Sequence, residues 1–473
     1  MHLAKKLAFA VGALGVAAAT ATAGTALTAG TGLTAGTGSA AALAAVVVRP
    51  DVLHVGATHR DGPTTTAQCE ATLHIACYEP TQVQQAYNLP ALYAKGITGK
   101  GTTIVIVDSF GSPTIKHDLS VFDSTFGIAA PPSFHVITPA GKLPKWNPSD
   151  SDMTGWGGET TLDVEYAHTI APGANILLVE TPVSETEGVH GFPQIVAAEE
   201  YVLKHYHPAV ISQSFSATEQ TFPNKAAVQA LRGANYAAQK DRVTMLAASG
   251  DSGAADVGLD GSTYYLFPVT SWSDSDPLVT GVGGTQMHLD ATGNHVTPDT
   301  VWNDTYNSYA TDSNVPSALA GGGGKSIFFS RPSYQNGVKA EVGDARGVPD
   351  ISMSGACNGA VDTYSSFAGN PVGWSQTCGT SEATPLFAGI VALASQDAGH
   401  SLGLINPALY EMSARDMPGI VQVTSGNNTV AFTQNGKQYT VKGWSARTGY
   451  SLAAGVGTVN ALYFVPELAN LAS

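Results

Sequence analysis

A serine stands at the start of a predicted helix in the last third of the chain. Residues 378–385 read Cys-Gly-Thr-Ser-Glu-Ala-Thr-Pro and run on into the apolar stretch 386–393. Gly379 permits a tight turn and Pro385 suits a first helical turn, so Ser381 falls at a helix N-terminus. The free N–H groups and the positive dipole end there favour the negative charge that develops beside a nucleophilic serine. The alternative is a loop and helix cap without chemistry.

Two carboxyl side chains four residues apart supply a candidate base. Glu159 and Asp163 follow two glycines at 157–158, and their spacing places both on one face of a predicted helix. Two carboxyls in one site titrate as a coupled pair, so one keeps its proton to higher pH. Such a pair would act as a base in acid solution, where histidine is protonated. The alternative is a solvated acidic helix face, which is common on protein surfaces.

A third carboxyl follows a predicted strand. Asp251, in the segment Ser-Gly-Asp-Ser-Gly at 249–253, comes shortly after the apolar run 243–247. This position puts its side chain at the carboxyl end of a strand, where the sites of parallel sheets gather. An aspartate donates a hydrogen bond to an oxyanion only while it is protonated, which again indicates acid. A turn residue without chemistry is the alternative.

Strand and helix patterns alternate around these candidates. The runs typical of buried parallel strands are 103–107, 176–179, 209–211 and 243–247. Helical patterns lie at 80–93, 159–170, 191–205 and 225–239. The alternation predicts right-handed βαβ units and a parallel sheet covered by helices on both faces. The glycine run 321–324 lacks the context of a phosphate-binding loop, so we expect it to be flexible or to pack its backbone tightly.

Together these motifs resemble the sedolisin, or serine-carboxyl peptidase, family. The matching segments lie at 158–163, 171–173, 249–253, 346–350 and 379–385, and the resemblance covers about residue 77 to the C-terminus. It implies an α/β fold, subtilisin-like, with three α/β/α layers and a central mostly parallel sheet. It also implies Ser381 as nucleophile, Glu159 as general base and acid, Asp163 as the partner of Glu159 and Asp251 as oxyanion stabiliser. A secreted, acid-active serine-carboxyl endopeptidase that works through an acyl-enzyme is the leading hypothesis.

Two features depart from the family pattern near the substrate site and at the N-terminus. Ser214, Phe215 and Ser216 stand where the family's substrate-lining segment is usually Ser-Trp-Gly, which leaves the subsite preference open. Family members usually carry a large folded prodomain. Only about fifty residues separate the predicted signal peptide from Cys77, too few for a dependable core. We therefore expect folding without that helper or with one supplied separately.

The C-terminal calcium site of the family also differs here. The family places one aspartate before Ile-Thr-x-Gly and a second after Gly-Tyr or Gly-Trp, and calcium takes six or more oxygen ligands with carboxylates prominent among them. Gln422 occupies the first position, and Ser451 or Ser445 the second, depending on the alignment. Both carboxylates are lost either way, so we expect no tight calcium site and no other cofactor.

A histidine triad is the rival mechanism for Ser381. Asp108 follows directly after a predicted strand, where a subtilisin-like enzyme carries its aspartate. His190 lies eighty-two residues after Asp108 and is followed directly by a glycine. This arrangement predicts a subtilisin-like peptidase that is active near neutral pH and indifferent to Glu159. A catalytically silent binding protein on the same fold is a third hypothesis, motivated by the absent prodomain and calcium aspartates.

The N-terminus indicates export. Two lysines at 5–6 precede the apolar stretch 7–19 and the small residues 21–23, as in a cleaved signal peptide. The stretch is shorter than the roughly 20 residues that span a bilayer, so we expect a secreted, extracellular protein. The predicted divisions are a signal peptide at 1–23, a low-complexity spacer with a short extension at 24–76, and a sedolisin-like peptidase domain at 77–473.

Four cysteines then predict two disulfides. Sequence proximity pairs Cys69 with Cys77, and Cys357 with Cys378. Zinc is a weaker alternative, because no two cysteines have C-x-x-C spacing. The second disulfide would tie a preceding loop to the nucleophile turn.

Composition restricts the partners. Charged residues make up 12% of the chain, which is low for a globular protein, and the formal net charge is −15. Nucleic-acid binding requires a basic patch, and we find no cluster of lysines and arginines. We expect a monomer whose partners are protein or peptide substrates, with neither nucleic acid nor a membrane as a ligand.

Overall fold

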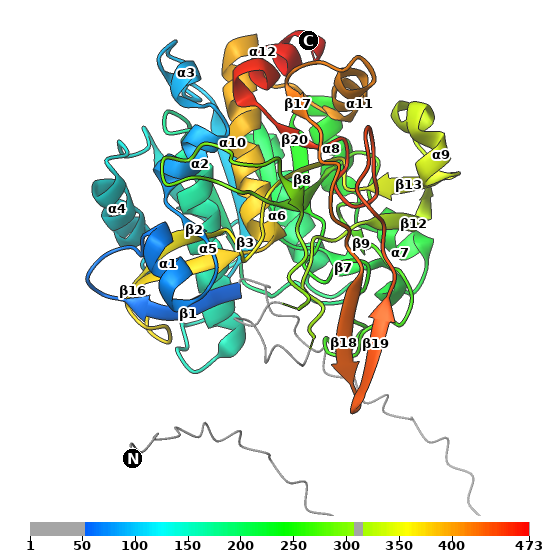
Figure 1. Cartoon of the computed structure of the whole chain (residues 1–473), viewed down its shortest axis with the longest axis horizontal. Coiled ribbons are helices and arrows are strands. Elements are labelled where there is room, and N and C mark those ends of the chain that lie inside the picture. Colours follow the sequence, from blue (N-terminus) through cyan, green and yellow to red (C-terminus); the bar gives the residue numbers. More distant parts are fainter. Residues whose placement is uncertain (1–52, 307–315, 473) are drawn as a thin grey trace, which may run out of the picture. The chain divides into compact units, whose positions relative to one another are not determined.

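A parallel sheet lies at the centre of the computed structural model, which describes residues 53–306 and 316–472 (Figure 1). The predicted signal peptide and the spacer up to residue 52 lie outside the described residues. The strand order is β11-β10-β8-β6-β3-β5-β4, and β14 also pairs with β10. All these pairs are parallel except β10 with β11. The strands are β3 (Thr103–Ser109), β4 (Phe134–Ile137), β5 (Asn175–Thr181), β6 (Val210–Gln213), β8 (Thr244–Ala248), β10 (Thr280–Gln286), β11 (Thr300–Val301) and β14 (Ile351–Ser354).

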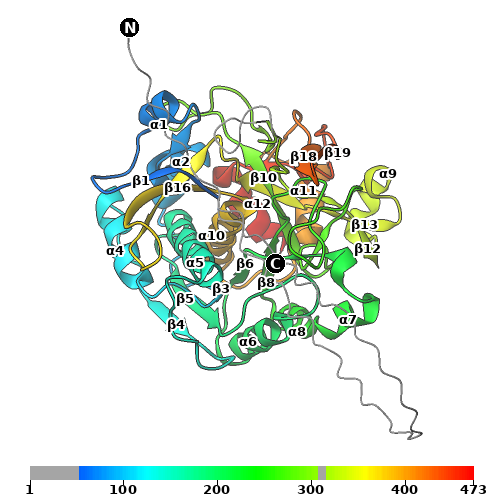
Figure 2. The same ribbon diagram turned by 90° about the horizontal axis from the view of Figure 1, so that it is seen from below.

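Apolar side chains cover both faces of this sheet. In β3, Ile104 and Ile106 belong to one core cluster, whereas Val105 and Val107 belong to another, because successive side chains of a strand point to opposite faces. The first cluster includes residues of α5 (Ser151–Ile170) and α10 (Thr380–Ala398), and the second includes residues of α6 (Phe192–His205) and α8 (Gly233–Asp241). Figure 2 shows these helices on opposite sides of the sheet, so the predicted three-layer α/β/α arrangement is confirmed.

Three predicted helices have different bounds. The helix expected at 80–93 is divided into α2 (Pro80–Ala86) and α3 (Pro90–Tyr93), because Asn88 is left-handed with φ 59° and Pro90 has no N–H to continue a helix. The helix expected at 225–239 is divided into α7 (Lys225–Ala230) and α8. α8 starts at Gly233, where a Cβ atom would lie 2.0 Å from Glu200 Oε1. α5 starts at Ser151 rather than 159, since the Asp150 carboxylate caps its first N–H groups.

A second sheet brings the first described strand next to the nucleophile turn. Its order is β1-β16-β15-β2, formed by β1 (Leu53–His59), β2 (Cys77–Tyr78), β15 (Ala360–Ser365) and β16 (Gly373–Cys378). β1 is antiparallel to β16, with Leu53 opposite Cys378. Regular structure therefore begins before the expected start near Cys77, because β16 supplies a partner for β1.

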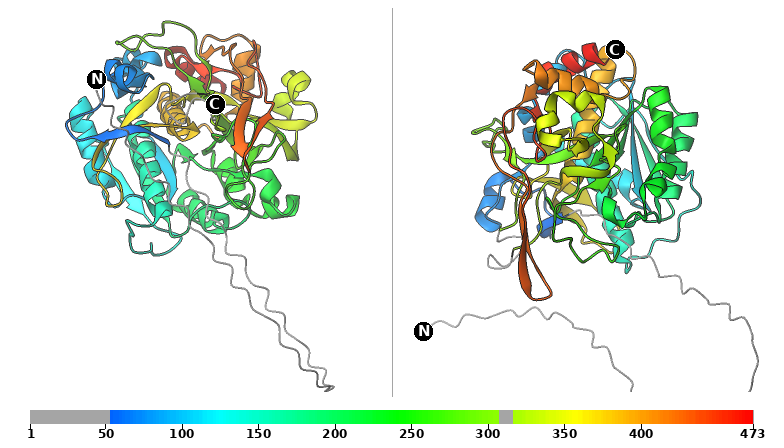
Figure 3. Two further views of the ribbon diagram at one scale, coloured as in Figure 1. Left: turned by 60° about the horizontal axis from the view of Figure 1, so that its bottom comes forward. Right: turned by 90° about the vertical axis from the view of Figure 1, so that its right-hand side faces the viewer.

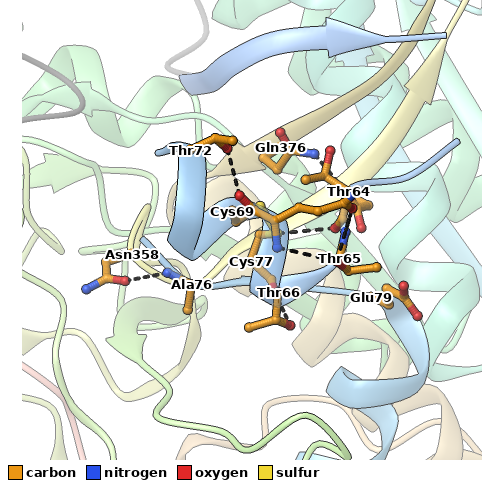
Figure 4. The surroundings of a disulfide bond; sticks show 12 residues. Thr64, Thr65, Thr66, Cys69, Thr72, Ala76, Cys77, Glu79, Asn358 and Gln376 are labelled. Carbon is orange, nitrogen blue, oxygen red and sulfur yellow. Dashed lines mark hydrogen bonds between the residues drawn. A yellow bond between two sulfur atoms is a disulfide. The ribbon is translucent and has the colours of Figure 1, made fainter. Parts of the chain in front are cut away.

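Both predicted disulfides are confirmed. Cys69 and Cys77 join α1 (Thr66–Thr72) to β2, and Figure 4 shows the capping Thr65 and the Asn358 side chain nearby. The Asn358 Oδ1 atom accepts a hydrogen bond from Ala76 N at 2.9 Å. The second disulfide joins Cys357 to Cys378, which directly precedes Gly379 and so fixes the start of the nucleophile turn.

The remaining elements surround these two sheets. The β18–β19 hairpin projects from the body of the molecule (Figure 3). None of the helices in the described ranges has the length and apolarity needed to cross a bilayer. The remaining helices are α4 (Ile115–Phe126), α9 (Lys339–Val342), α11 (Asn406–Ala414) and α12 (Ala461–Leu471), and the remaining strands are β7 (Ala217–Thr218), β9 (Ser271–Trp272), β12 (Gly324–Ser330), β13 (Ala345–Val348), β17 (Ile420–Val421), β18 (Val430–Gln434), β19 (Lys437–Val441) and β20 (Thr458–Val459).

Candidate active site

Helices α5 and α10 lie side by side and carry three of the predicted site residues (Figure 2). Gly389 of α10 permits this close contact, since a Cβ there would lie 2.5 Å from the Cβ of Ile170 on α5. Ser381 lies in the first turn of α10, and Glu159 and Asp163 lie on α5; all three are buried. The alternative of a solvated acidic helix face is therefore wrong for Glu159 and Asp163, because α10 and the sheet cover them.

The proline of the nucleophile helix lies one turn later than predicted. α10 begins at Thr380, so Pro385 falls in its second turn and not in its first. Pro385 has no N–H, and that group would have bonded to the Ser381 carbonyl oxygen four residues earlier. The Ser214 hydroxyl oxygen lies 3.4 Å from this carbonyl oxygen. Pro385 thus leaves the backbone of the nucleophile accessible to a neighbouring side chain.

Ser214 connects the nucleophile to the carboxyl pair. It directly follows β6, and its hydroxyl donates a hydrogen bond to Asp163 Oδ1 at 2.9 Å. Its backbone oxygen accepts a hydrogen bond from Ser381 Oγ at 3.5 Å. The sequence suggested only a substrate-lining role for Ser214, because a backbone contact with a residue 167 positions away has no local signature.

The other two predicted substrate-lining residues differ in exposure. Phe215 is buried, with its ring centroid 6.1 Å from that of Trp156 and 6.3 Å from that of Phe192. Ser216 is partly exposed. The side chain of Phe215 therefore packs into the core beneath residues 214–216. Of Phe215 and Ser216, only Ser216 is accessible to a ligand.

Three carboxyl groups gather where α5 meets β3. Burial, followed by the charges of Asp108 and Glu159, holds the pKa of Asp163 well above its usual range, and the bond from Ser214 opposes this. Burial raises the pKa of Asp108 to about 7, and the nearby Thr160 hydroxyl lowers it in part. Asp108 therefore lies beside the carboxyl pair, as a third buried acid.

Asp251 lies directly against the nucleophile turn. Thr380 donates two hydrogen bonds to its Oδ1 atom, one from N and one from Oγ1, each 2.7 Å long. A Cβ on Gly379, whose φ is 132°, would lie 2.5 Å from the Asp251 Oδ2 atom, so this position requires glycine. The role of Thr380 was not predicted, although its place directly before Ser381 is the signal that could have suggested it.

The electrostatic surroundings of Asp251 favour its neutral form. Burial raises its pKa to about 7; the bonds from Thr380 oppose this shift, and the charge of Asp256 adds to it. No lysine or arginine of the described ranges pairs with Asp251, Asp108 or Asp163. A protonated aspartic acid beside a serine at a helix N-terminus is suited to donating a hydrogen bond to an oxyanion.

The histidines do not take part in this cluster. His190 is exposed, and within residues 53–306 and 316–472 no hydrogen bond or ion pair joins it to Asp108 or Ser381. His168 is buried on α5, but its Nε2 atom faces Ala129 O and Asp123 Oδ1, at 2.9 and 3.4 Å. The rival triad of Asp108, His190 and Ser381 is therefore not brought together.

The residues at the expected calcium position contact the backbone. Gln422 Oε1 accepts a hydrogen bond from Gly449 N at 2.6 Å, and Ser451 Oγ accepts one from Ala454 N at 3.1 Å. Neither side chain supplies a carboxylate, and calcium sites rely on several. These residues do not fit the calcium site of the family.

A cavity opens beside the carboxyl cluster. It has a volume of about 560 Å³ and lies at the carboxyl ends of β3, β4 and β5. Phe110, Trp146 and Met153 contribute apolar walls, and Glu180 also lines the cavity. Burial and then the charge of Asp108 raise the pKa of Glu180 to about 8.

Comparisons with known proteins identify the family of the chain. Residues 149–450 match the Subtilase family. Kumamolisin of Bacillus sp. (strain MN-32) is 30% identical over 393 residues, covering 81% of this chain and 63% of kumamolisin. Sedolisin of Pseudomonas sp. (strain 101) is 28% identical over 390 residues, covering 81% of this chain and 60% of sedolisin. The chain thus spans less than two thirds of the length of either relative.

A solved structure gives the same result in three dimensions. The structure of Pseudomonas sedolisin, a serine-carboxyl proteinase complexed with pseudo-iodotyrostatin, superposes with a TM-score of 0.67 at 25% identity. The match covers 84% of this chain and all of that one. The chain belongs to the subtilase family and, within it, to the sedolisin group of serine-carboxyl peptidases.

Proposed function

We propose that this protein is an exported endopeptidase that hydrolyses peptide bonds in acid solution through an acyl-enzyme on Ser381. The observation that carries the proposal is the placement of Asp251: it is buried, bonded to Thr380 beside the nucleophile, and has a pKa of about 7. A neutral aspartic acid at this point can stabilise an oxyanion only below that pH. Acid activity follows from this requirement.

The proposed reaction has two halves. Ser381 Oγ attacks the peptide carbonyl carbon and its proton passes to Glu159, while Asp251 donates a hydrogen bond to the resulting oxyanion. The C–N bond breaks as Glu159 gives that proton to the leaving amine. Water then attacks the carbonyl carbon of the acyl-enzyme and gives a proton to Glu159. The ester bond to Ser381 breaks as Glu159 returns that proton to Ser381 Oγ.

The carboxyl pair sets the pH range of this reaction. Asp163, whose pKa lies well above its usual range, stays protonated and supports Glu159, which must be ionised to accept the proton. Activity falls at low pH when Glu159 takes up a proton, and it falls as the pH rises through about 7, when Asp251 loses one. The profile should therefore be a bell on the acid side of neutrality.

Protein or peptide chains are the proposed substrates. Ser216 is the accessible member of the segment after β6, and the cavity of about 560 Å³ lined by Glu180 would take a side chain of the substrate. Export is supported by the two disulfides, which require an oxidising compartment.

Cleavage of an acid-denatured protein between pH 2 and 8 tests this function. We expect activity confined to acid in the wild type and lost by at least about a thousandfold in Ser381→Ala and Glu159→Gln, since both remove groups of the bond-making step. Ser395→Ala and Glu165→Gln are the matched controls. They change the same residue types on the same helices, and Glu165 accepts its bond from Tyr364 N instead.

Each outcome discriminates between the hypotheses. Activity that peaks near neutral pH and survives Glu159→Gln would contradict the proposal and favour a histidine base. Wild-type protein that cleaves nothing over the whole range, while remaining folded by circular dichroism, would favour a silent binding protein.

A further inference from the structure

The glycine run 321–324 packs tightly against the turn that carries Asp251. A Cβ on Gly322 would lie 1.8 Å from the Ser249 carbonyl oxygen and 2.9 Å from that of Gly250. Gly322 N donates a hydrogen bond to Gly250 O at 2.7 Å, and its own carbonyl oxygen accepts one from Ser249 Oγ at 3.1 Å. Of the two expectations for this run, flexibility is therefore wrong and close packing is correct, because no side chain larger than hydrogen fits.

Ala320, directly before this run, holds the backbone of Asp251 itself. Ala320 N donates to Asp251 O at 2.9 Å, and Ala320 O accepts from Gly253 N at 2.8 Å. The turn is thus bonded on both sides of the aspartate. Its main chain cannot shift unless these bonds lengthen.

A segment from the C-terminal region closes the other side of the turn. Asn428 O accepts a hydrogen bond from Ala254 N at 2.9 Å, and a Cβ on Gly253 would lie 2.5 Å from Val430 Cγ1. Asn303 holds this segment in place, since its Nδ2 atom donates to the carbonyl oxygens of Asn427 and Thr429 at 2.8 Å each. The turn therefore lies between the glycine run and residues 427–430.

We propose that the glycine run 321–324 is a positioning element for Asp251, with Gly322 as its critical residue. Gly322 touches the backbone of Ser249 and Gly250, and so acts through the main chain rather than on a substrate. This fixes the carboxyl against Thr380 and Gly379. An oxyanion donor must be placed to within a fraction of an ångström, and an error of about 1 Å can cost about a hundredfold in rate. The inference rests on the proposed role of Asp251.

The first test is Gly322→Ala with Gly337→Ala as the matched control. The new methyl group at 322 must displace the Ser249 carbonyl, whereas a Cβ on exposed Gly337 has nothing within 4 Å. We expect kcat of Gly322→Ala to fall at least tenfold with KM changed less than twofold, and Gly337→Ala to keep both values. If Gly322→Ala raised KM and left kcat at the wild-type value, or changed neither, the proposal would be overturned.

A double-mutant cycle identifies the residue through which Gly322 acts. If the glycine run works through Asp251, Gly322→Ala should reduce kcat at least tenfold in the wild type and less than twofold in an Asp251→Ala background. Independent, multiplying losses would overturn the proposal. Full activity of Asp251→Ala alone would instead contradict the proposed function, so the two failures are distinguishable.

Hydrogen exchange of the intact protein gives a readout that needs no activity. In Gly322→Ala, amide exchange in the peptide covering 249–255 should accelerate at least tenfold, while peptides of α6 and α8 keep their wild-type rates. Ser249→Ala, which removes the hydrogen bond from Ser249 Oγ to Gly322 O, is the second variant if Gly322→Ala does not fold. Unchanged exchange in 249–255 for the folded variant would refute the positioning role.

Discussion

Two buried aspartates in this protein are neutralised in different ways. Asp350 is fully buried against Arg346, whose Nη1 and Nη2 atoms donate to its Oδ1 and Oδ2 at 2.7 and 2.5 Å, and the Tyr410 hydroxyl also donates to it at 2.9 Å. Asp251 is buried to a similar extent, but its partner is the uncharged Thr380, and its pKa is raised to about 7. One carboxyl has a cation; the other has to keep a proton.

This difference separates structural acids from acids that can work in catalysis. A carboxylate that is paired with arginine stays ionised over the whole useful pH range and contributes a fixed bond. A carboxyl without a cation changes its charge near the working pH, so it can donate a hydrogen bond or accept a proton. Asp108 and Asp163 belong with Asp251, because no lysine or arginine of the described residues pairs with them.

Breaking the paired region should have the largest effect on stability. Arg346→Met leaves Asp350 buried without its cation, which typically costs about 3–5 kcal/mol. Denaturant unfolding should show this loss, whereas Arg346→Lys, which keeps a cation beside Asp350, should lose less stability. An equal loss for the two variants would mean that the missing packing of Arg346, and not its charge, causes the effect.

Changing the unpaired region should alter the rate more than the stability. Asp251→Ala should reduce kcat by about 10²–10³-fold in acid, as expected for loss of one oxyanion donor. Asp251→Asn keeps a donor at every pH, so it should extend activity above the wild-type limit near pH 7. The measurement is kcat against pH with one peptide substrate. If the asparagine variant lost activity at the same pH as the wild type, another group would set that limit.

A buried acid outside the candidate site tests whether burial without a cation raises the pKa of a carboxyl elsewhere in the protein. Glu199 on α6 is buried, and burial followed by the charge of Glu200 raises its pKa from 4.5 to about 8. Its stabilising contribution is complete below about pH 4.5 and is lost as the pH rises through 8, because the folded protein then binds more protons than the unfolded chain. Wild-type stability should therefore decline over this interval, by at most about 1.4 kcal/mol per pH unit from this residue.

Glu199→Gln removes that titration. From pH 5 to pH 8, the unfolding free energy of Glu199→Gln should increase relative to that of the wild type. We expect an increase on the order of 1 kcal/mol or more. Denaturant titrations at four pH values would measure it. A difference that does not depend on pH would show that Glu199 titrates normally in the folded protein.

The sequence predicted best what local spacing determines. The interval of four residues between Glu159 and Asp163, the strand patterns and the short separation of Cys69 and Cys77 all translate directly into structure. Ser381 is likewise found at a helix N-terminus because Gly379 and the apolar run after it define that helix.

What the sequence could not predict depends on contacts between distant segments. The pairing of Leu53 with Cys378 joins positions 325 residues apart, and the contact of Gly322 with Ser249 exists only because two loops meet in the fold. The sequence predicts that Asp108 ends a strand, which suggested a histidine triad. It does not predict which strand lies beside Asp108 or which helix covers it. The charge of each carboxyl follows from such neighbours.

The smallest effect is expected at an exposed ion pair of the same chemistry. Arg415 Nη1 lies 2.9 Å from Glu411 Oε1, as Arg346 lies close to Asp350, but both side chains are more than half exposed. Water and salt already solvate these charges, so Arg415→Ala should cost no more than about 0.5 kcal/mol at any pH. Denaturant unfolding alongside Arg346→Met measures both. Because both pairs join an arginine to a carboxylate four residues away, a similar loss for the two variants would mean that burial is not what distinguishes them.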